Sequence, residues 1–129
     1  IVRYVESGYT LGIVGARTFT DYSRMERFIR EVINEHGLPS QVVSGGARGA
    51  DSLANTWAMS RGIPMITHLP NWNLYGKRAA FIRNSKIIED ADILIAFPSI
   101  SGKGTQMTMK LAETSGIECI ADGGWELND

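Results

Sequence analysis

A chain of 129 residues with 43% hydrophobic and 21% charged residues has the length and composition of one globular domain, which excludes disordered and collagen-like classes. The net charge is −1, so nucleic-acid binding would need a local basic patch and is not expected. Cys119, the single cysteine, excludes an intrachain disulfide, and its apolar surroundings predict a buried, unpaired thiol. No apolar run reaches about 18 residues, so we expect a cytoplasmic protein. No cluster of metal-ligating residues stands out in the sequence, and we expect neither a metal nor a cofactor.

The first half of the chain alternates apolar runs with amphipathic stretches, which predicts strands alternating with helices. A short buried strand over residues 11–15 ends at a glycine. Residues 21–36 carry an apolar stripe at helical spacing, and a glycine and a proline beyond it predict the end of this helix. A second strand is expected over 41–44, a helix over 50–61 and a third strand over 65–69.

The second half continues the alternation after a loop with two aromatic residues over 70–76. We expect a helix over 77–91, a nearly all-apolar strand over 92–97, a helix over 105–115 and a last strand over 117–121. The side chains expected to face inward from these two helices are Ala80, Phe81, Ile87, Ile88, Ala91, Met107, Leu111 and Ala112.

Strands that are apolar on both sides, each followed by a helix, predict a parallel sheet covered on both faces. Right-handed crossovers and short connections leave a Rossmann-like, three-layer α/β/α fold with a mainly parallel sheet of order 3-2-1-4-5. We expect residues 1–129 to form a single domain, with an N-terminal arm or edge strand over 1–10 and a polar tail over 122–129.

Glycine-rich loops follow three of the predicted strands, at the edge where such sheets bind their ligands. Each glycine can serve an ordinary turn, but glycine beside a cation or hydroxyl at a helix start is also the composition of a phosphate site. The candidate phosphate-binding residues in these loops are Gly15, Arg17, Gly45, Gly46, Arg48, Gly49, Gly102, Gly104 and Thr105.

Several of these loop residues have two interpretations. The guanidinium groups of Arg17 and Arg48 either grip a phosphate at two points or lie in solvent. Asp51 stands in the first turn of its helix, where it either caps the helix or acts on a ligand, by binding a ribose hydroxyl or in catalysis. The hydroxyl of Thr105 is either an N-cap or a phosphate donor.

Polar and aromatic residues outside the glycine loops also qualify as candidates. Asn84 lies on a helix face that is otherwise apolar, so its amide needs a partner from the backbone or a ligand, and Arg83 borders the same stripe. Trp72 and Tyr75 either stack on a base or pack over the edge of the core. His68, in a strand beside the expected site, is a further candidate for a ligand contact.

Four motifs together resemble the SLOG superfamily, which joins the Smf/DprA proteins to the LOG phosphoribohydrolases. They are Gly15-Ala-Arg-Thr-Phe-Thr-Asp21, Val43-Ser-Gly-Gly-Ala-Arg-Gly-Ala-Asp51, Lys77-Arg-Ala-Ala-Phe-Ile-Arg-Asn84 and Gly102-Lys-Gly-Thr105. The second is similar to the Ser-Gly-x-Ala-Arg-Gly-x-Asp signature of Smf/DprA, and the chain resembles in particular the small YspA-like, YpsA-related branch of bacteria and their phages. The resemblance implies a Rossmann-like fold, a nucleotide or nucleotide-derived ligand and a homodimer or larger oligomer.

One departure from the LOG pattern bears on catalysis. LOG enzymes carry Pro-Gly-Gly-x-Gly-Thr-x-x-Glu, and the position of the glutamate falls here on Thr108, which cannot act as a carboxylate base. The leading interpretation is therefore a nucleotide-binding sensor or sequestering protein. One alternative is a nucleoside 5′-monophosphate N-glycosidase, with Asp51 as the catalytic carboxylate and Arg83 or Arg48 holding the phosphate. The other is single-stranded DNA binding in the Smf/DprA manner.

Overall fold

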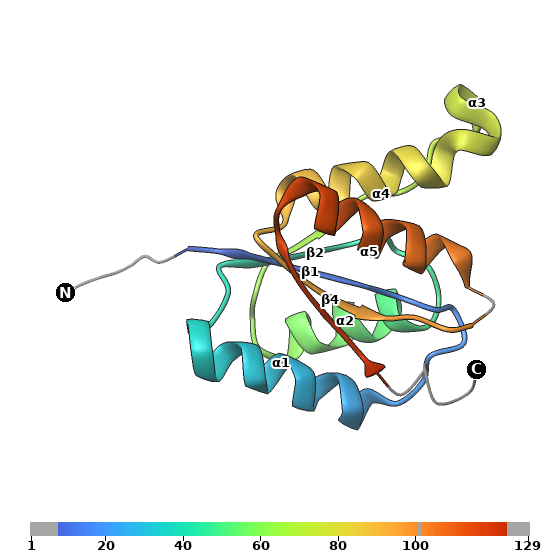
Figure 1. Cartoon of the computed structure of the whole chain (residues 1–129). Coiled ribbons are helices and arrows are strands. Elements are labelled where there is room, and N and C mark those ends of the chain that lie inside the picture. The colour runs from blue at the N-terminus through green and yellow to red at the C-terminus, as the bar shows by residue number, and fades with distance from the viewer. Residues whose placement is uncertain (1–7, 101, 124–129) are drawn as a thin grey trace.

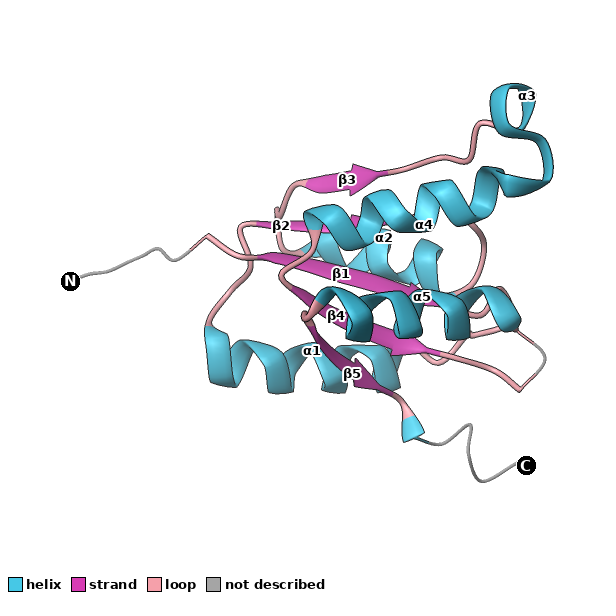
Figure 2. Cartoon of the chain, turned by 45° about the horizontal axis from the view of Figure 1, so that its top comes forward, coloured by secondary structure: helices cyan, strands magenta, loops and turns pink. Residues whose placement is uncertain are grey.

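A five-stranded sheet runs through the centre of the structure, a computed structural model that describes residues 8–100 and 102–123. Its strands are β1 (Thr10–Gly15), β2 (Gln41–Ser44), β3 (Met65–Thr67), β4 (Ile93–Phe97) and β5 (Glu118–Ala121). They lie in the order β3-β2-β1-β4-β5, and every neighbouring pair is parallel (Figure 2). The fold class and the strand order predicted from the sequence are both confirmed.

Helices cover both faces of this sheet. They are α1 (Tyr22–His36), α2 (Ala50–Ser60), α3 (Trp72–Tyr75), α4 (Ala79–Asp90) and α5 (Lys103–Ser115). The first two lie on one face, α4 and α5 lie side by side on the other, and α3 projects beyond the start of α4 (Figure 1). The segment predicted as a loop over 70–76 therefore contains a short helix, and a 3₁₀ turn over Gly76–Arg78 precedes α4, which begins at Ala79 rather than at residue 77.

Side chains along β4 alternate between the two faces of the sheet, so this strand packs against both layers of helices. Ile93, Ile95 and Phe97 belong to the core under α1 and α2. Leu94 and Ala96 point the other way and belong to the core under α4 and α5. Because each face of the strand is covered, the strand appears in the sequence as an uninterrupted apolar run.

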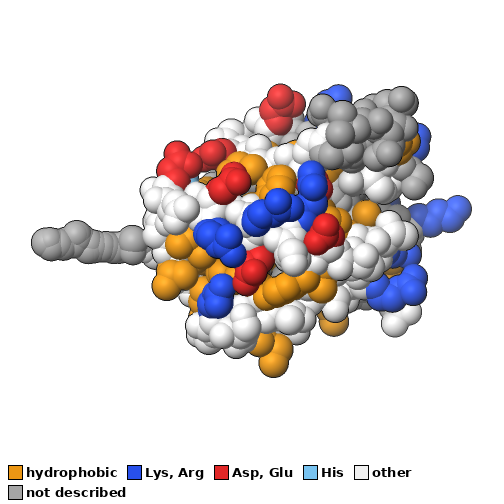
Figure 3. Space-filling model, turned by 90° about the horizontal axis from the view of Figure 1, so that it is seen from below, with side chains coloured by type: hydrophobic (Ala, Val, Ile, Leu, Met, Phe, Trp, Pro, Cys, Tyr) orange, Lys and Arg blue, Asp and Glu red, His pale blue; other side chains and the backbone are white. Residues whose placement is uncertain are grey.

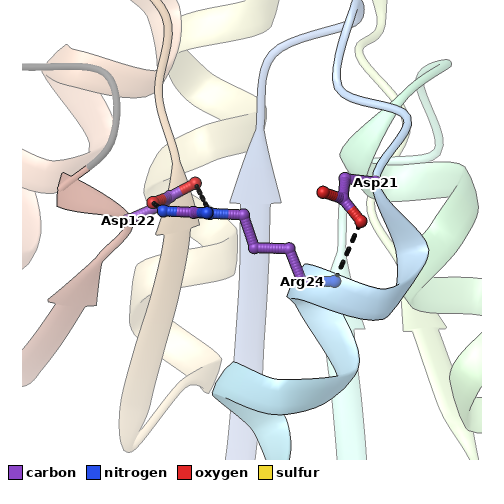
Figure 4. Close-up of polar contacts among 3 residues, drawn as sticks. All are labelled: Asp21, Arg24 and Asp122. Atoms are coloured by element: carbon purple, nitrogen blue, oxygen red, sulfur yellow. Dashed lines mark hydrogen bonds and ion pairs between the residues drawn. The ribbon is translucent and has the colours of Figure 1, made fainter. Parts of the chain in front are cut away.

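An ion pair joins the start of α1 to the end of β5 (Figure 4). The carboxylate of Asp21 caps α1 by accepting a hydrogen bond of 3.1 Å from the backbone N–H of Arg24. The guanidinium of Arg24 then reaches Asp122 with two hydrogen bonds, 2.7 Å from Nε and 2.6 Å from Nη2. This two-point contact connects residues 98 positions apart in the chain.

Two of the predicted inward-facing residues, and the predicted buried thiol, are placed differently. Phe81 and Met107 are 47% and 53% exposed, because they line a groove between α4 and α5 instead of reaching the sheet. The inward position at the start of α4 is taken by Ala79, which is buried. Cys119 is unpaired but only half-buried, because β5 is an edge strand of the sheet.

The alternatives for the two chain ends stay predictions, because residues 1–7 and 124–129 lie outside the described part of the chain. Within that part, β1 begins at Thr10 and β5 ends at Ala121. None of the described helices has the length and apolar composition needed to cross a membrane.

Candidate functional site

A cavity of about 360 Å³ opens at the carboxyl edge of the sheet, beside the end of β1. The chain passes from β1 toward β2 on one side and from β4 toward β5 on the other, so the strand order reverses between β1 and β4. Open parallel sheets commonly bind their ligands at such a reversal. The predicted site residues that line the cavity are Gly15, Arg17, Asp51, Arg83, Asn84, Gly102, Gly104 and Thr105.

Two glycines allow the loops after β1 and β2 to approach each other closely. A Cβ on Gly15 would lie 2.5 Å from the Cβ of Ala50, so only glycine lets the start of α2 reach the end of β1. Gly49 has a φ of +75°, and a Cβ there would collide with the carbonyl of Ala16. The same carbonyl accepts a 3.2 Å hydrogen bond from the N–H of Ala50, which joins the two loops.

Asp51 is a buried carboxylate that organises the loop before α2. Asp51 is only 7% exposed, and its Oδ1 accepts a hydrogen bond of 3.0 Å from the Ser44 hydroxyl. Its Oδ2 accepts one of 3.1 Å from the N–H of Ala47. Burial raises the pKa of Asp51, while these two hydrogen bonds and the positive charge of Arg83 act in the opposite direction.

Arg83 is a half-buried cation on the opposite wall of the cavity. Its Nη1 donates to the carbonyl of Gly45 at 2.8 Å, and its Nε donates to Asn84 Oδ1 at 2.7 Å. Burial lowers the pKa of Arg83, the charge of Asp51 raises it, and the nearby charge of Arg17 lowers it again. The Nη2 of Arg83 has no hydrogen-bond partner among the described residues, so two N–H donors are left for a ligand.

The start of α5 supplies a second set of free donors. Its N-cap is Gly102, which offers no side-chain hydrogen bond, so Thr105 is not the N-cap. Thr105 is 9% exposed, and its hydroxyl makes no hydrogen bond to any residue that the structure describes. Thr108, at the position of the LOG glutamate, is buried and donates its hydroxyl to the carbonyl of Gly104 at 2.9 Å.

Other predicted site residues lie outside this cavity. Arg48 is exposed and does not line it. Trp72 and Tyr75, 53% and 38% exposed on α3, line neither this cavity nor the groove beside it. His68 pairs instead with Asp90, at 2.6 Å between Nε2 and Oδ2. The three glycines that shape the loop without lining the cavity are Gly45, Gly46 and Gly49.

Some wall residues were not among the predicted ones. Thr18, Ala47 and Ser99 also line the cavity. All three stand in loops that follow predicted strands, so the predicted ends of the strands would have placed them at this edge of the sheet. Sequence alone does not tell which residue of such a loop turns toward the cavity.

The candidate metal-binding side chains lie away from the cavity. In the portion of the chain that the structure describes, one trio, Glu35, His36 and Glu118, brings candidate ligand atoms within 4.8 Å of one another. All three residues are exposed, and none of them lines the cavity.

An open parallel sheet with a cavity at its strand reversal defines a Rossmann-like α/β protein. Residues 12–75 match the family described as the YspA, cpYpsA-related SLOG family. The Gene 61 protein of Mycobacterium phage D29 is 31% identical over 117 residues, which cover 86% of this chain and 94% of that protein. The chain belongs to the YspA, cpYpsA-related SLOG family, as its motifs predicted.

Proposed function

We propose that the cavity at the end of β1 binds a nucleotide or nucleotide-derived ligand through its phosphate, and that the protein acts as a sensor or sequesters that ligand. One observation carries the proposal: two guanidinium groups, those of Arg17 and Arg83, line the same cavity, and the Nη2 of Arg83 has no partner among the described residues. An anion between them would accept charge-assisted hydrogen bonds from both guanidinium groups.

The rest of the cavity fits the same ligand class. The Thr105 hydroxyl and the uncapped N–H groups at the start of α5 are donors, and a helix N-terminus favours negative charge. The volume of about 360 Å³ is that of a small-molecule site, since such pockets span about 300–1,000 Å³. Membership of the YspA, cpYpsA-related SLOG family supports a ligand of this class but does not identify the particular nucleotide.

The test compares two exposed arginines in neighbouring loops. Arg17 lines the cavity and Arg48 does not, so Arg48→Ala is the matched control for Arg17→Ala. Calorimetry with inorganic phosphate, ribose 5-phosphate and nucleoside 5′-monophosphates should show binding that Arg17→Ala weakens by roughly 10- to 150-fold, the effect of one charge-assisted hydrogen bond. Arg48→Ala should leave it unchanged. Absence of binding to all of these compounds would refute the proposal.

Hydrolysis of a nucleoside 5′-monophosphate is the second candidate function, and the buried carboxylate of Asp51 at the cavity wall favours it. Both Asp51 oxygens already accept hydrogen bonds from the protein, and Thr108 offers no carboxylate, so we expect little turnover. Chromatography for released base decides between the two. Rapid release that Asp51→Asn abolishes, with binding intact, would establish the enzyme.

Two further expectations concern partners. Acidic and basic side chains are interspersed over the face that carries α1 and α2, so this face presents no uniform basic surface for a single-stranded DNA (Figure 3). We expect no oligonucleotide affinity of the strongly salt-dependent kind. We also propose a homodimer, which sedimentation measurements over a range of protein concentrations would detect.

A further inference from the structure

A second hollow of about 250 Å³ lies between α4 and α5, directly beside the first cavity. The two share four wall residues, Ala80, Asn84, Gly104 and Thr108, so they adjoin each other along this line. The outer walls of the second hollow include the large apolar side chains of Phe81, Met107 and Leu111. A cavity with charged side chains in its walls thus continues into a more apolar groove.

Asn84 stands where the two hollows adjoin. Its Oδ1 accepts the 2.7 Å hydrogen bond from Arg83 Nε, which fixes the orientation of the amide. The Nδ2 group has no partner in the described part of the chain and keeps two N–H donors. At the boundary between the cavity and the groove, the Nδ2 group of Asn84 therefore offers hydrogen-bond donors that no described residue uses.

Phe81 and Met107 come from adjacent helices and leave much apolar surface in water, with exposed fractions of 47% and 53%. An aromatic ring offers a stacking face, and a thioether makes favourable contacts with aromatic edges. A flat heteroaromatic ring between these two side chains would cover both of them.

We infer that the groove between α4 and α5 is the subsite for the base of the ligand, so that the phosphate lies by Arg17 and Arg83 and the ring lies between Phe81 and Met107. The inference rests on the proposed phosphate site. Asn84 Nδ2 then donates to an oxygen of the sugar between the phosphate and the ring. The sequence of surfaces, cationic, polar and apolar, follows the order of groups in a nucleoside monophosphate.

This assignment moves base stacking from the residues that the sequence suggested. Trp72 and Tyr75 are aromatic and lie on α3, but neither lines the groove or the cavity. Trp72 is exposed to the same 53% as Met107, so it serves as a matched control for the loss of an exposed side chain.

The experiment measures the affinities of the full chain for ribose 5-phosphate and for adenosine and guanosine 5′-monophosphate by calorimetry. Stacking of one base corresponds to a preference for a nucleotide of roughly 5- to 150-fold. Phe81→Ala and Met107→Ala should each reduce this preference and leave the affinity for ribose 5-phosphate unchanged. Trp72→Ala should change neither affinity, and thermal unfolding confirms that each variant is folded.

Other outcomes refute the inference in distinguishable ways. If ribose 5-phosphate binds but neither nucleotide binds more tightly, or if Trp72→Ala removes the preference, the subsite is wrong and the phosphate site stands. If no phosphate compound binds, the proposed function fails as well. If Phe81→Ala dissociates a dimer and leaves the preference intact, a second copy of the chain covers the groove instead.

Discussion

Two loops at the carboxyl edge of the sheet, the one after β2 and the one after β4, both carry glycines and both begin a helix. In the first, the carboxylate of Asp51 lies buried in the opening turn of α2 and accepts hydrogen bonds from Ser44 and Ala47. In the second, Gly102 is the N-cap of α5 and makes no side-chain hydrogen bond, and the hydroxyl of Thr105 has no partner among the described residues. Among the described residues, the chain places an anion at the start of α2 and none at the start of α5.

The difference shows that a glycine-rich loop before a helix is not by itself an anion site. An acidic residue in the first turn can already occupy the position that a phosphate would take. The two helix starts should therefore respond differently to substitution, in stability at α2 and in binding at α5.

The largest expected effect comes from adding one methyl group to the loop before α2 and one to the first turn of α5. Gly49→Ala forces a Cβ against the carbonyl of Ala16 at a φ of +75°, so we expect a loss of stability on the order of 3 kcal/mol. Gly104→Ala adds its Cβ in open space within α5, where alanine is the better helix former, so stability should rise by up to about 1 kcal/mol. Urea unfolding measures both. Equal losses in the two variants would contradict the contrast between the loops.

A smaller effect is expected from Asp51→Asn. An amide cannot accept both hydrogen bonds that the carboxylate accepts, so the loop before α2 should lose about 1–3 kcal/mol of stability at neutral pH. Thermal and urea unfolding of the two proteins give this difference directly. Unchanged stability would mean that the loop is held by its glycines and backbone alone.

The same variant tests the sign of the pKa shift. Because burial raises the pKa of Asp51 above its ordinary value of 3.8, the folded state holds the proton more strongly than the unfolded chain does. The stability due to that proton is present below 3.8 and is lost as the pH rises through the folded-state pKa. The stability advantage of the wild-type protein over Asp51→Asn should thus be larger in acid than at neutral pH. An advantage that grows toward neutral pH would show that the hydrogen bonds and Arg83 outweigh burial.

The smallest effect on stability is expected at the open helix start. Thr105→Val keeps the shape of the side chain and removes a hydroxyl that has no protein partner in the described structure, so stability should change by less than about 0.5 kcal/mol. The affinity for ribose 5-phosphate should fall by roughly 2- to 10-fold, as for one neutral hydrogen bond. A variant that loses stability but keeps its affinity would place the hydroxyl in the fold rather than in the site.

The sequence predicts the strand order because apolar runs such as that of β4 are buried on both faces, and few topologies satisfy this requirement. It also predicts that Asn84, a polar residue on an apolar helix face, must have a partner, although the partner is the side chain of Arg83 and not the backbone or ligand that was expected. Both conclusions follow from burial alone.

Other features depend on where helices and side chains point in the folded structure, which cannot be predicted from the sequence. Helical spacing marks Phe81 and Met107 as apolar-face residues but does not reveal that α4 and α5 leave a groove between them. Likewise Arg17 and Arg48 occupy similar glycine loops, and only the backbone path decides that the first lines the cavity and the second does not.

The central place of β1 has a consequence for the newly made chain. β1 pairs with β2 about thirty residues later, for example Leu11 with Val42, but its other neighbour, β4, is synthesised far later, and Leu11 pairs there with Ile93. Until β4 has been synthesised, one edge of the apolar strand β1 has unpaired backbone hydrogen-bonding groups. Other chains can pair with such an edge during synthesis. The contact of Arg24 with Asp122 forms only once β5 has been added. The N-terminal half therefore reaches its final packing only after β4 and β5 have been synthesised.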